Sequence, residues 1–210
     1  MSHDIAHGGG HAHVVDPEDH HYTSLGLDSL KLAFWCFLGS ECFFFGSLIG
    51  TYMSYRGKSL VGPYPREVFS VEVTSISTFI LLMSSLTMVL AVRDAKLGKR
   101  ATTMGWLLFT AALGASFVGF QIFEFYHFFV EKGLSLQGNL FGSTFFTLTG
   151  FHGTHVAVGV LWLLLLTLWV GRSWIRGDQG TVVEVAGLYW HFVDIVWIVI
   201  FTLIYLMEYT

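Results

Sequence analysis

The sequence predicts an all-α integral membrane bundle of five transmembrane helices, and two observations support this fold class. First, 53% of the 210 residues are hydrophobic and 12% are charged, whereas soluble proteins carry about 25% charged residues. Second, five apolar runs are long enough for a helix, which rises about 1.5 Å per residue, to cross a hydrocarbon layer of roughly 30 Å. We expect these helices at residues 30–54, 70–92, 102–130, 141–170 and 186–208.

A polar tail, residues 1–29, precedes the predicted membrane domain, residues 30–210. The tail holds six of the ten histidines and neither Lys nor Arg, so it lacks the basic start and the apolar core of a secretory signal. We interpret it as a solvated His-rich segment. Adventitious metal binding and proton buffering near the surface are the alternatives.

The first apolar run carries one acid, Glu41, near its middle. A carboxyl group at that depth is costly unless it is neutral, hydrogen-bonded or hydrated. Two interpretations stay open: a neutral structural group that bonds a neighbouring helix, and a proton-linked or lipid-linked carboxyl. Cys36 and Cys42 lie six residues apart, without the short spacing of a metal or redox dithiol, and are expected to be small core residues.

The distribution of Lys and Arg predicts the orientation of the helices. The segment RDAKLGKR places four basic residues between the second and third runs. With the N-terminus in the cytoplasm, seven basic residues flank the inner ends of the helices and four flank the outer ends. The positive-inside rule therefore favours a cytoplasmic N-terminus and a C-terminus outside. No basic tract suggests nucleic acid as a partner.

Polar side chains recur at three-residue spacing inside the later apolar runs, which places each pair on one side of its helix. These groups need partners from other helices. From their depths, we expect His155, His191 and Asp194 to form an interhelical hydrogen-bonded cluster. The candidate polar site residues are Glu41, Gln121, Glu124, His152, His155, Glu184, His191 and Asp194.

The polar residues of the apolar runs also suggest three other functional classes. A copper or zinc site would need His152, His155 and His191 to converge with an acid. Hydrogen bonds between carboxyl and imidazole groups satisfy the same side chains without an ion, so no metal site is expected. An independent proton or ion transporter, with Glu41, Glu124 and Asp194 as its relay, stays open as a more remote alternative, although the sequence shows no internal repeat and no helices broken by Gly or Pro around a midplane site. A membrane b-type cytochrome is the third class, and a haem absorbance spectrum would identify it.

Four motifs then carry a resemblance that covers nearly all of the chain after residue 30. They are LGSECFFFG at 38–46, GFQIFEF at 119–125, GSTFFTLTGFHGTHV at 142–156 and YWHFVDIVW at 189–197. Together they resemble subunit III of the haem-copper terminal oxidases, in a short five-helix bacterial form. By this resemblance, all eight candidate residues match polar signature positions of the family.

The resemblance implies an accessory role in a proton-pumping cytochrome c oxidase of the aerobic respiratory chain, in the bacterial plasma membrane. Subunits I and II are expected to hold the haems and copper, and this chain to hold no redox centre and no catalytic residue. The resemblance also implies packing on subunit I, contact with subunit II and with a small subunit IV, and bound phospholipid. The resemblance further implies that the chain supports proton uptake and the stability of the complex during turnover. Subunit III of a quinol oxidase is the alternative.

Overall fold

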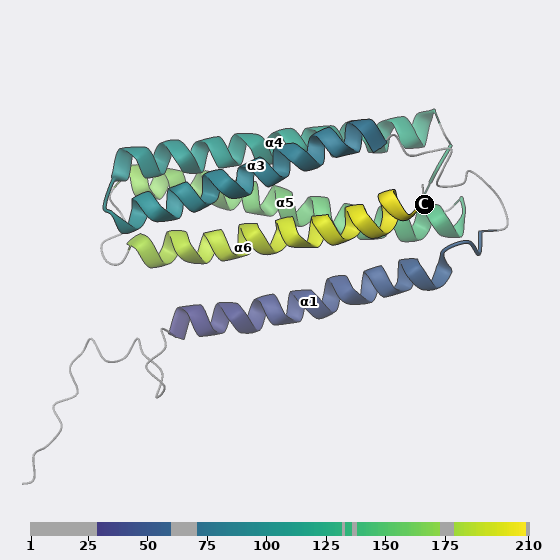
Figure 1. Ribbon diagram of the computed structural model, residues 1–210, viewed down its shortest axis with the longest axis horizontal. Coiled ribbons are helices and arrows are strands. Elements are labelled where there is room, and N and C mark those ends of the chain that lie inside the picture. The colour runs from purple at the N-terminus through teal and green to yellow at the C-terminus, as the bar shows by residue number, and fades with distance from the viewer. Residues whose placement is uncertain (1–28, 60–70, 132, 136–137, 173–178, 209–210) are drawn as a thin grey trace, which may run out of the picture. The chain divides into compact units, whose positions relative to one another are not determined.

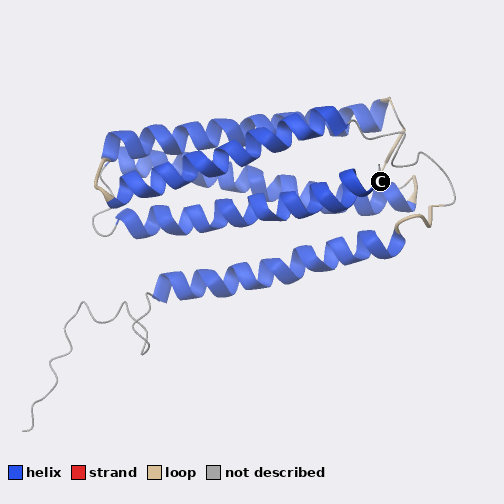
Figure 2. Ribbon diagram, in the orientation of Figure 1, coloured by secondary structure: helices blue, strands red, loops and turns tan. Residues whose placement is uncertain are grey.

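The computed structural model describes residues 29–59, 71–131, 133–135, 138–172 and 179–208, and the regular structure among them is helical, with no strand (Figures 1 and 2). The predicted tail lies outside the described residues except for Ser29. In chain order the helices are α1 (Ser29–Tyr55), α3 (Val71–Lys96), α4 (Arg100–Val130), α5 (Leu140–Arg172) and α6 (Gln179–Ile200). A π-helical turn (Phe201–Tyr205) and a 3₁₀ turn (Leu206–Glu208) continue α6.

The chain divides into two compact units, residues Met1–Phe37 and Leu38–Thr210. In the first unit, the described residues form the first part of α1, where the rings of Phe34 and Phe37 are 5.6 Å apart. The second unit contains the rest of α1 and the four other helices. All eight candidate residues belong to it.

A tight turn joins α3 to α4 as an antiparallel hairpin. Gly98 has a φ of 68°, in the left-handed region where glycine is favoured because it has no Cβ. The backbone N–H groups of Leu97, Gly98 and Lys99 donate to carbonyls in the last turn of α3, which would otherwise lack partners. This turn therefore holds the basic RDAKLGKR segment at one end of the bundle.

Four helices pack as a ring in which α3 contacts α4 and α6, and α5 contacts the same two helices. Trp190 of α6 lies at the centre and is 1% exposed. A Cβ atom at Gly114 of α4 or Gly159 of α5 would press against its indole ring. Its Nε1–H donates to Ser84 of α3 at 2.9 Å. The Trp190 side chain thus requires that α4 and α5 lie close to it and that α3 supplies a hydroxyl as hydrogen-bond acceptor.

The part of α1 in the second unit reaches the ring of helices through large aromatic side chains. Phe44 lies edge-on to Phe151, at 5.2 Å between ring centroids, and Tyr52 lies 6.4 Å from Phe141. Phe45 and Tyr52 are each 2% exposed. Beyond the end of α1, the guanidinium of Arg56 donates to the carbonyl of Met207 at 2.8 Å.

The last helix differs from its predicted span at both ends. It begins at Gln179, seven residues before the predicted start at 186, so the polar residues up to Glu184 are helical rather than part of a link. The hydropathy of a segment does not set where its helix begins, because a helix can continue into the headgroup region as long as its polar residues reach water. At the other end, the π-helical turn shifts the register and buries Ile204 and Tyr205.

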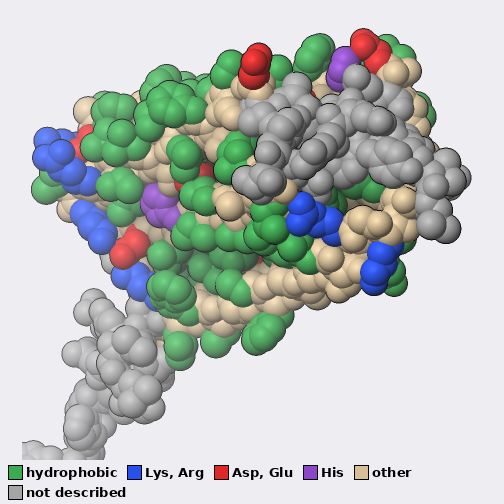
Figure 3. All heavy atoms as spheres, turned by 45° about the vertical axis from the view of Figure 1, so that its right-hand side comes forward, with side chains coloured by type: hydrophobic (Ala, Val, Ile, Leu, Met, Phe, Trp, Pro, Cys, Tyr) green, Lys and Arg blue, Asp and Glu red, His purple; other side chains and the backbone are tan. Residues whose placement is uncertain are grey.

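Five described helices are long and apolar enough to cross a membrane: Ser29–Tyr55, Glu72–Lys96, Arg100–Val130, Leu140–Arg172 and Gly180–Tyr205. Large hydrophobic side chains on these helices face outward, as Phe43 and Ile122 illustrate with exposed fractions of 84% and 65%. Figure 3 shows hydrophobic side chains over much of the visible surface and a group of Lys and Arg side chains at one end. The all-α, five-span fold class is confirmed, and the orientation of the termini stays a prediction. The expectation that Cys36 and Cys42 are core residues was wrong, because both side chains are exposed on α1.

We expect Gly114→Ala to destabilise the bundle, because the added methyl group would overlap Trp190. Overpacking of this kind costs about 1–3 kcal/mol of unfolding free energy. The matched control is Gly119→Ala on the same helix, where a Cβ meets no atom within 4 Å. Thermal unfolding of the purified protein in detergent compares the two. Equal unfolding temperatures for both variants would contradict this packing.

Candidate functional site

Glu41 of α1 and His155 of α5 form a contact between two helices within the apolar region. The Nε2 atom of His155 lies 3.2 Å from Oε2 of Glu41, and the two side chains are 20% and 18% exposed. The ring of Phe45 lies 5.0 Å from the imidazole, edge-on. The hydroxyl of Tyr189 in α6 donates to the His155 carbonyl at 3.0 Å. The carboxyl group predicted to need an interhelical partner therefore has one.

The hydrogen bond of the second ring nitrogen of His155 determines which protonation states the contact with Glu41 can adopt. Nδ1 lies 2.7 Å from the carbonyl of Phe151, and a carbonyl only accepts, so Nδ1 carries a hydrogen. Nε2 then either accepts from a protonated Glu41 or, as N–H, donates to its carboxylate. These two states differ by the position of one proton along the same contact. The pair can accordingly exchange a proton without moving its heavy atoms.

His152, one turn before His155, lies in an aromatic cage and is fully buried. Its ring stacks on Trp197 of α6, with centroids 4.9 Å apart and planes 21° from parallel. Phe117 and Phe45 approach it edge-on. Among the described residues, neither of its ring nitrogens has a hydrogen-bond partner. His152 is therefore held by aromatic packing and not by hydrogen bonds. Phe45 contacts both His152 and His155, as expected for residues on one side of the helix.

Gln121 and Glu124 of α4 face two different helices. The amide nitrogen of Gln121 donates to the Thr149 carbonyl of α5 at 2.6 Å, and a Cβ at Gly153 would collide with that amide. Glu124, buried to 5% exposure, accepts from the Thr74 hydroxyl of α3 at 2.5 Å. These two polar residues therefore cross-link α4 to α5 and to α3.

The predicted cluster of His155, His191 and Asp194 is divided in the structure. His155 faces Glu41, whereas Nδ1 of His191 lies 2.6 Å from the hydroxyl oxygen of Ser85 in α3. The Ser85 hydroxyl also lies near the carboxyl group of Asp194, whose Oδ1 has no hydrogen-bond partner among the described residues. This geometry suits a chain in which an imidazole N–H donates to the hydroxyl and the hydroxyl donates to the carboxyl. The expectation was wrong about His155 because depth fixes the level of a residue but not the side of the helix that it occupies.

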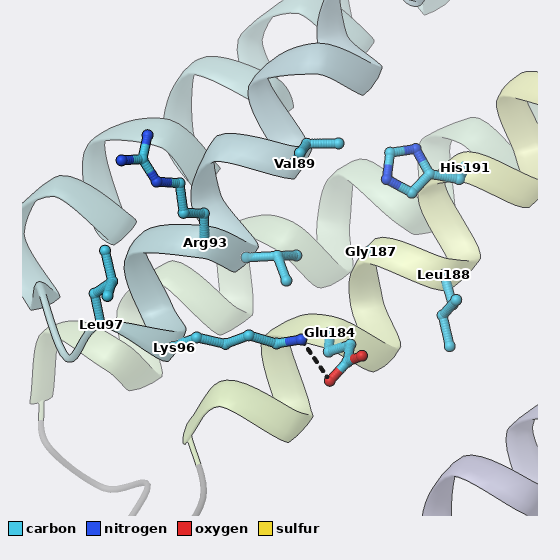
Figure 4. Close-up of a pocket in the computed structure, with 9 residues that line it drawn as sticks. Val89, Arg93, Lys96, Leu97, Glu184, Gly187, Leu188 and His191 are labelled. Carbon is cyan, nitrogen blue, oxygen red and sulfur yellow. Dashed lines mark ion pairs between the residues drawn. The ribbon is translucent and has the colours of Figure 1, made fainter.

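Glu184 lies on the first turns of α6 rather than in a link, and its Oε2 is 3.3 Å from Nζ of Lys96 in α3 (Figure 4). Both side chains are partly exposed, so this ion pair adds little stability. It marks the polar end of a groove between α3 and α6. Among the described residues, no group of three or more His, Cys, Asp or Glu side chains has the arrangement of a metal site.

Sequence reasoning missed the hydroxyl partners in this set of contacts. Thr74 and Ser85 belong to a Ser/Thr-rich string in which no single position stands out. Tyr205, which hydrogen-bonds Thr74, reaches it from the π-helical turn. The sequence does indicate that each buried carboxyl group needs a hydrogen-bond donor from another helix. It does not indicate which residue supplies that donor.

The sequence is similar to those of known proteins. Residues 17–209 match the family described as cytochrome c oxidase subunit III. A cytochrome c oxidase subunit 3 from Alkalihalophilus pseudofirmus is 40% identical, over 84% of this chain and 85% of the relative. A quinol oxidase subunit 3 from Bacillus spizizenii is also 40% identical, over 84% and 86%. A cytochrome bo(3) ubiquinol oxidase subunit 3 from Pseudomonas aeruginosa is 38% identical, over 96% and 93%.

We expect Asp194→Leu to lower the free energy of unfolding by about 1 kcal/mol, the scale of a side-chain hydrogen bond between membrane helices. Asp194→Asn should cost less, because its amide oxygen still accepts from Ser85. Ser85→Ala should cost at least as much, because it also removes the partner of His191, and the combined variant should be no worse than Ser85→Ala. Denaturation by SDS from mild-detergent micelles measures the series. Equal tolerance of Leu and Asn would contradict the contact.

Proposed function

We propose, from the premise that the chain belongs to the cytochrome c oxidase subunit III family, that it is the accessory subunit III of a proton-pumping haem-copper oxidase. The chain is a multi-pass protein of the bacterial plasma membrane and part of an oxidoreductase complex. In our proposal its role is non-catalytic, and subunits I and II hold the haems and copper. The match over residues 17–209 is the observation that carries this assignment.

The geometry of the histidines supports a chain without redox centres of its own. A haem or metal ligand needs a free ring nitrogen aimed at the ion. Both nitrogens of His155 have protein partners, as does Nδ1 of His191. His152 is enclosed by aromatic rings that would have to move for an ion to approach. Each of these three imidazoles is thus already used in packing or hydrogen bonding.

We assign cytochrome c as the electron donor of the complex and a quinol as the alternative. The relatives carry both names at 40% identity, so similarity does not separate the donors. The donor is a property of the partner subunits. A subunit II with the ligand set for two copper ions would support cytochrome c, and a subunit II without it would support the quinol.

In the proposed complex, the chain packs directly on subunit I, contacts subunit II and a small subunit IV, and binds phospholipid. Large apolar side chains exposed along the membrane spans support this arrangement, because they need either lipid or another subunit around them. The N-terminus is assigned to the cytoplasm from the distribution of Lys and Arg.

The Glu41–His155 pair supports a role in proton uptake and in stability during turnover. The two groups can share one proton, they are partly exposed, and they lie where α1 meets α5. A carboxyl–imidazole pair between two helices can take up a proton and release it again without any rearrangement of the helices. We propose this exchange as the contribution of the chain to proton-coupled turnover.

Glu41→Gln tests this function, because glutamine keeps the size and still donates to Nε2 but cannot ionise. We expect the complex to assemble with an unchanged haem spectrum, yet to lose activity sooner during turnover or to take up protons more slowly. Glu72→Gln, at an exposed position near the start of α3, is the matched control. If Glu41→Gln behaves as wild type while Glu41→Ala prevents assembly, Glu41 is structural and the proposed proton role fails.

A further inference from the structure

A second buried carboxyl group, that of Glu124, lies near one end of the bundle. Glu124 is six residues before the end of α4 at Val130, roughly 9 Å along the helix axis. The end of α4, the start of α3 and the end of α6 all lie away from the basic turn that joins α3 to α4 (Figure 1). Glu124 is 5% exposed, so neighbouring side chains must connect its carboxyl group with water.

Hydroxyl groups from two further elements lead away from this carboxyl group. The Thr74 hydroxyl of α3 donates to Oε1 of Glu124 at 2.5 Å. The Tyr205 hydroxyl, in the π-helical turn, hydrogen-bonds Thr74 and is close enough to Glu124 for their charges to interact. Because Thr74 has one hydroxyl hydrogen and donates it to Glu124, its oxygen is the acceptor for Tyr205. The three groups therefore form one chain that runs from Tyr205 to the carboxyl group.

Aromatic packing holds Tyr205 in this position. Its ring centroid lies 6.1 Å from that of Phe145 in α5 and 6.2 Å from that of Trp197 in α6, and the side chain is 1% exposed. The π-helical turn changes the register of the helix just before this residue, and such turns are frequent at functional sites. The packed ring thus keeps the hydroxyl directed at Thr74.

A small polar cavity lies next to Tyr52 of α1. Its volume is about 70 Å³, whereas a single water molecule needs roughly 10–15 Å³. Arg56, Ser59 and Thr144 also line it, and Arg56 and Ser59 come after the end of α1, so the cavity borders the polar end of the bundle. The Tyr52 hydroxyl is close enough to that of Tyr205 for their charges to interact. Tyr52 therefore lies between the cavity and the chain of hydroxyl groups.

We propose that Glu124 is a proton-binding site that exchanges with water at this end of the bundle through Thr74, Tyr205 and Tyr52. When a proton reaches the Tyr205 oxygen, the hydrogen of that hydroxyl passes to Thr74, and the Thr74 hydrogen passes to Oε1 of Glu124. One O–H bond breaks and one forms at each hydroxyl, and no heavy atom moves. In the orientation assigned above, the site opens to the outside of the membrane. Such a site does not depend on the oxidase role.

Infrared spectroscopy of the full-length chain in lipid nanodiscs tests the site. Glu124→Gln identifies the C=O stretching band of the Glu124 carboxyl group by its loss, and transfer to D₂O measures how fast that band shifts. Tyr205→Phe should slow the shift about a hundredfold, the lower end of what a positioned proton donor contributes. Thr74→Val should slow it equally, because it interrupts the same chain. In the control Tyr126→Phe, at an exposed tyrosine of α4, the band should shift as fast as in the wild type.

Filling the cavity tests the connection with water. Thr144→Leu should slow the shift of the Glu124 band by the same factor as Tyr205→Phe, because the larger side chain extends into the cavity. Thr147→Leu is the matched control on the same helix. Its hydroxyl also bonds a carbonyl of its own helix, but it lies outside the lining. Equal rates in these two variants would contradict the route through the cavity.

The backbone amide hydrogens exchange in the same spectra and report any general change in the opening of the bundle. A Glu124 band that shifts equally fast in Tyr205→Phe and Tyr126→Phe would overturn the proposal. An equal change in the exchange of the amide hydrogens would do the same, because Tyr205 would then act on packing alone. The proposal also fails if Glu124→Gln removes no carboxyl band at any pH at which the chain stays folded.

Discussion

A carboxyl group inside a membrane span must be satisfied by another helix, and the contact between Glu41 and His155 meets that constraint for α1. The part of α1 in the second unit packs through a few large side chains. The polar contact among them therefore fixes which side of α1 faces α5. Phe45 lies against both His155 and His152, and Tyr189 ties the backbone of His155 to α6. The pair therefore joins three helices at one level.

The other buried polar groups follow the same rule at other places in the ring of helices. Thr74 donates to Glu124, Ser85 hydrogen-bonds His191 and lies near Asp194, and Trp197 donates to Thr78. Each contact links α3 to another helix through a hydroxyl group. Hydroxyl side chains are well suited to this, because they bond their own backbone when unpaired and reach a facing helix when one is close. The bundle thus combines apolar packing around Trp190 with a set of specific polar links.

Hydropathy and spacing predict the five spans and the polar residues inside them, but not the pairing of those residues. His155 and Asp194 were expected together from their depth, yet one faces α1 and the other faces α3. Direction around a helix depends on how the helices are arranged, which a single sequence does not contain. Tyr205 was missed because a π-helical turn changes the register, and Gln179–Glu184 because polar residues at a membrane boundary look like a loop.

A double-mutant cycle between Glu41 and His155 tests the central claim most directly. The unfolding free energies of Glu41→Ala, His155→Ala and the double variant are compared with wild type in mild-detergent micelles. Residues in contact show coupling energies of about 0.5–3 kcal/mol, and we predict a value in that range. A parallel cycle between Glu41 and His191, which share no partner among the described contacts, should be additive. Additivity of Glu41 and His155 within about 0.3 kcal/mol would contradict the account.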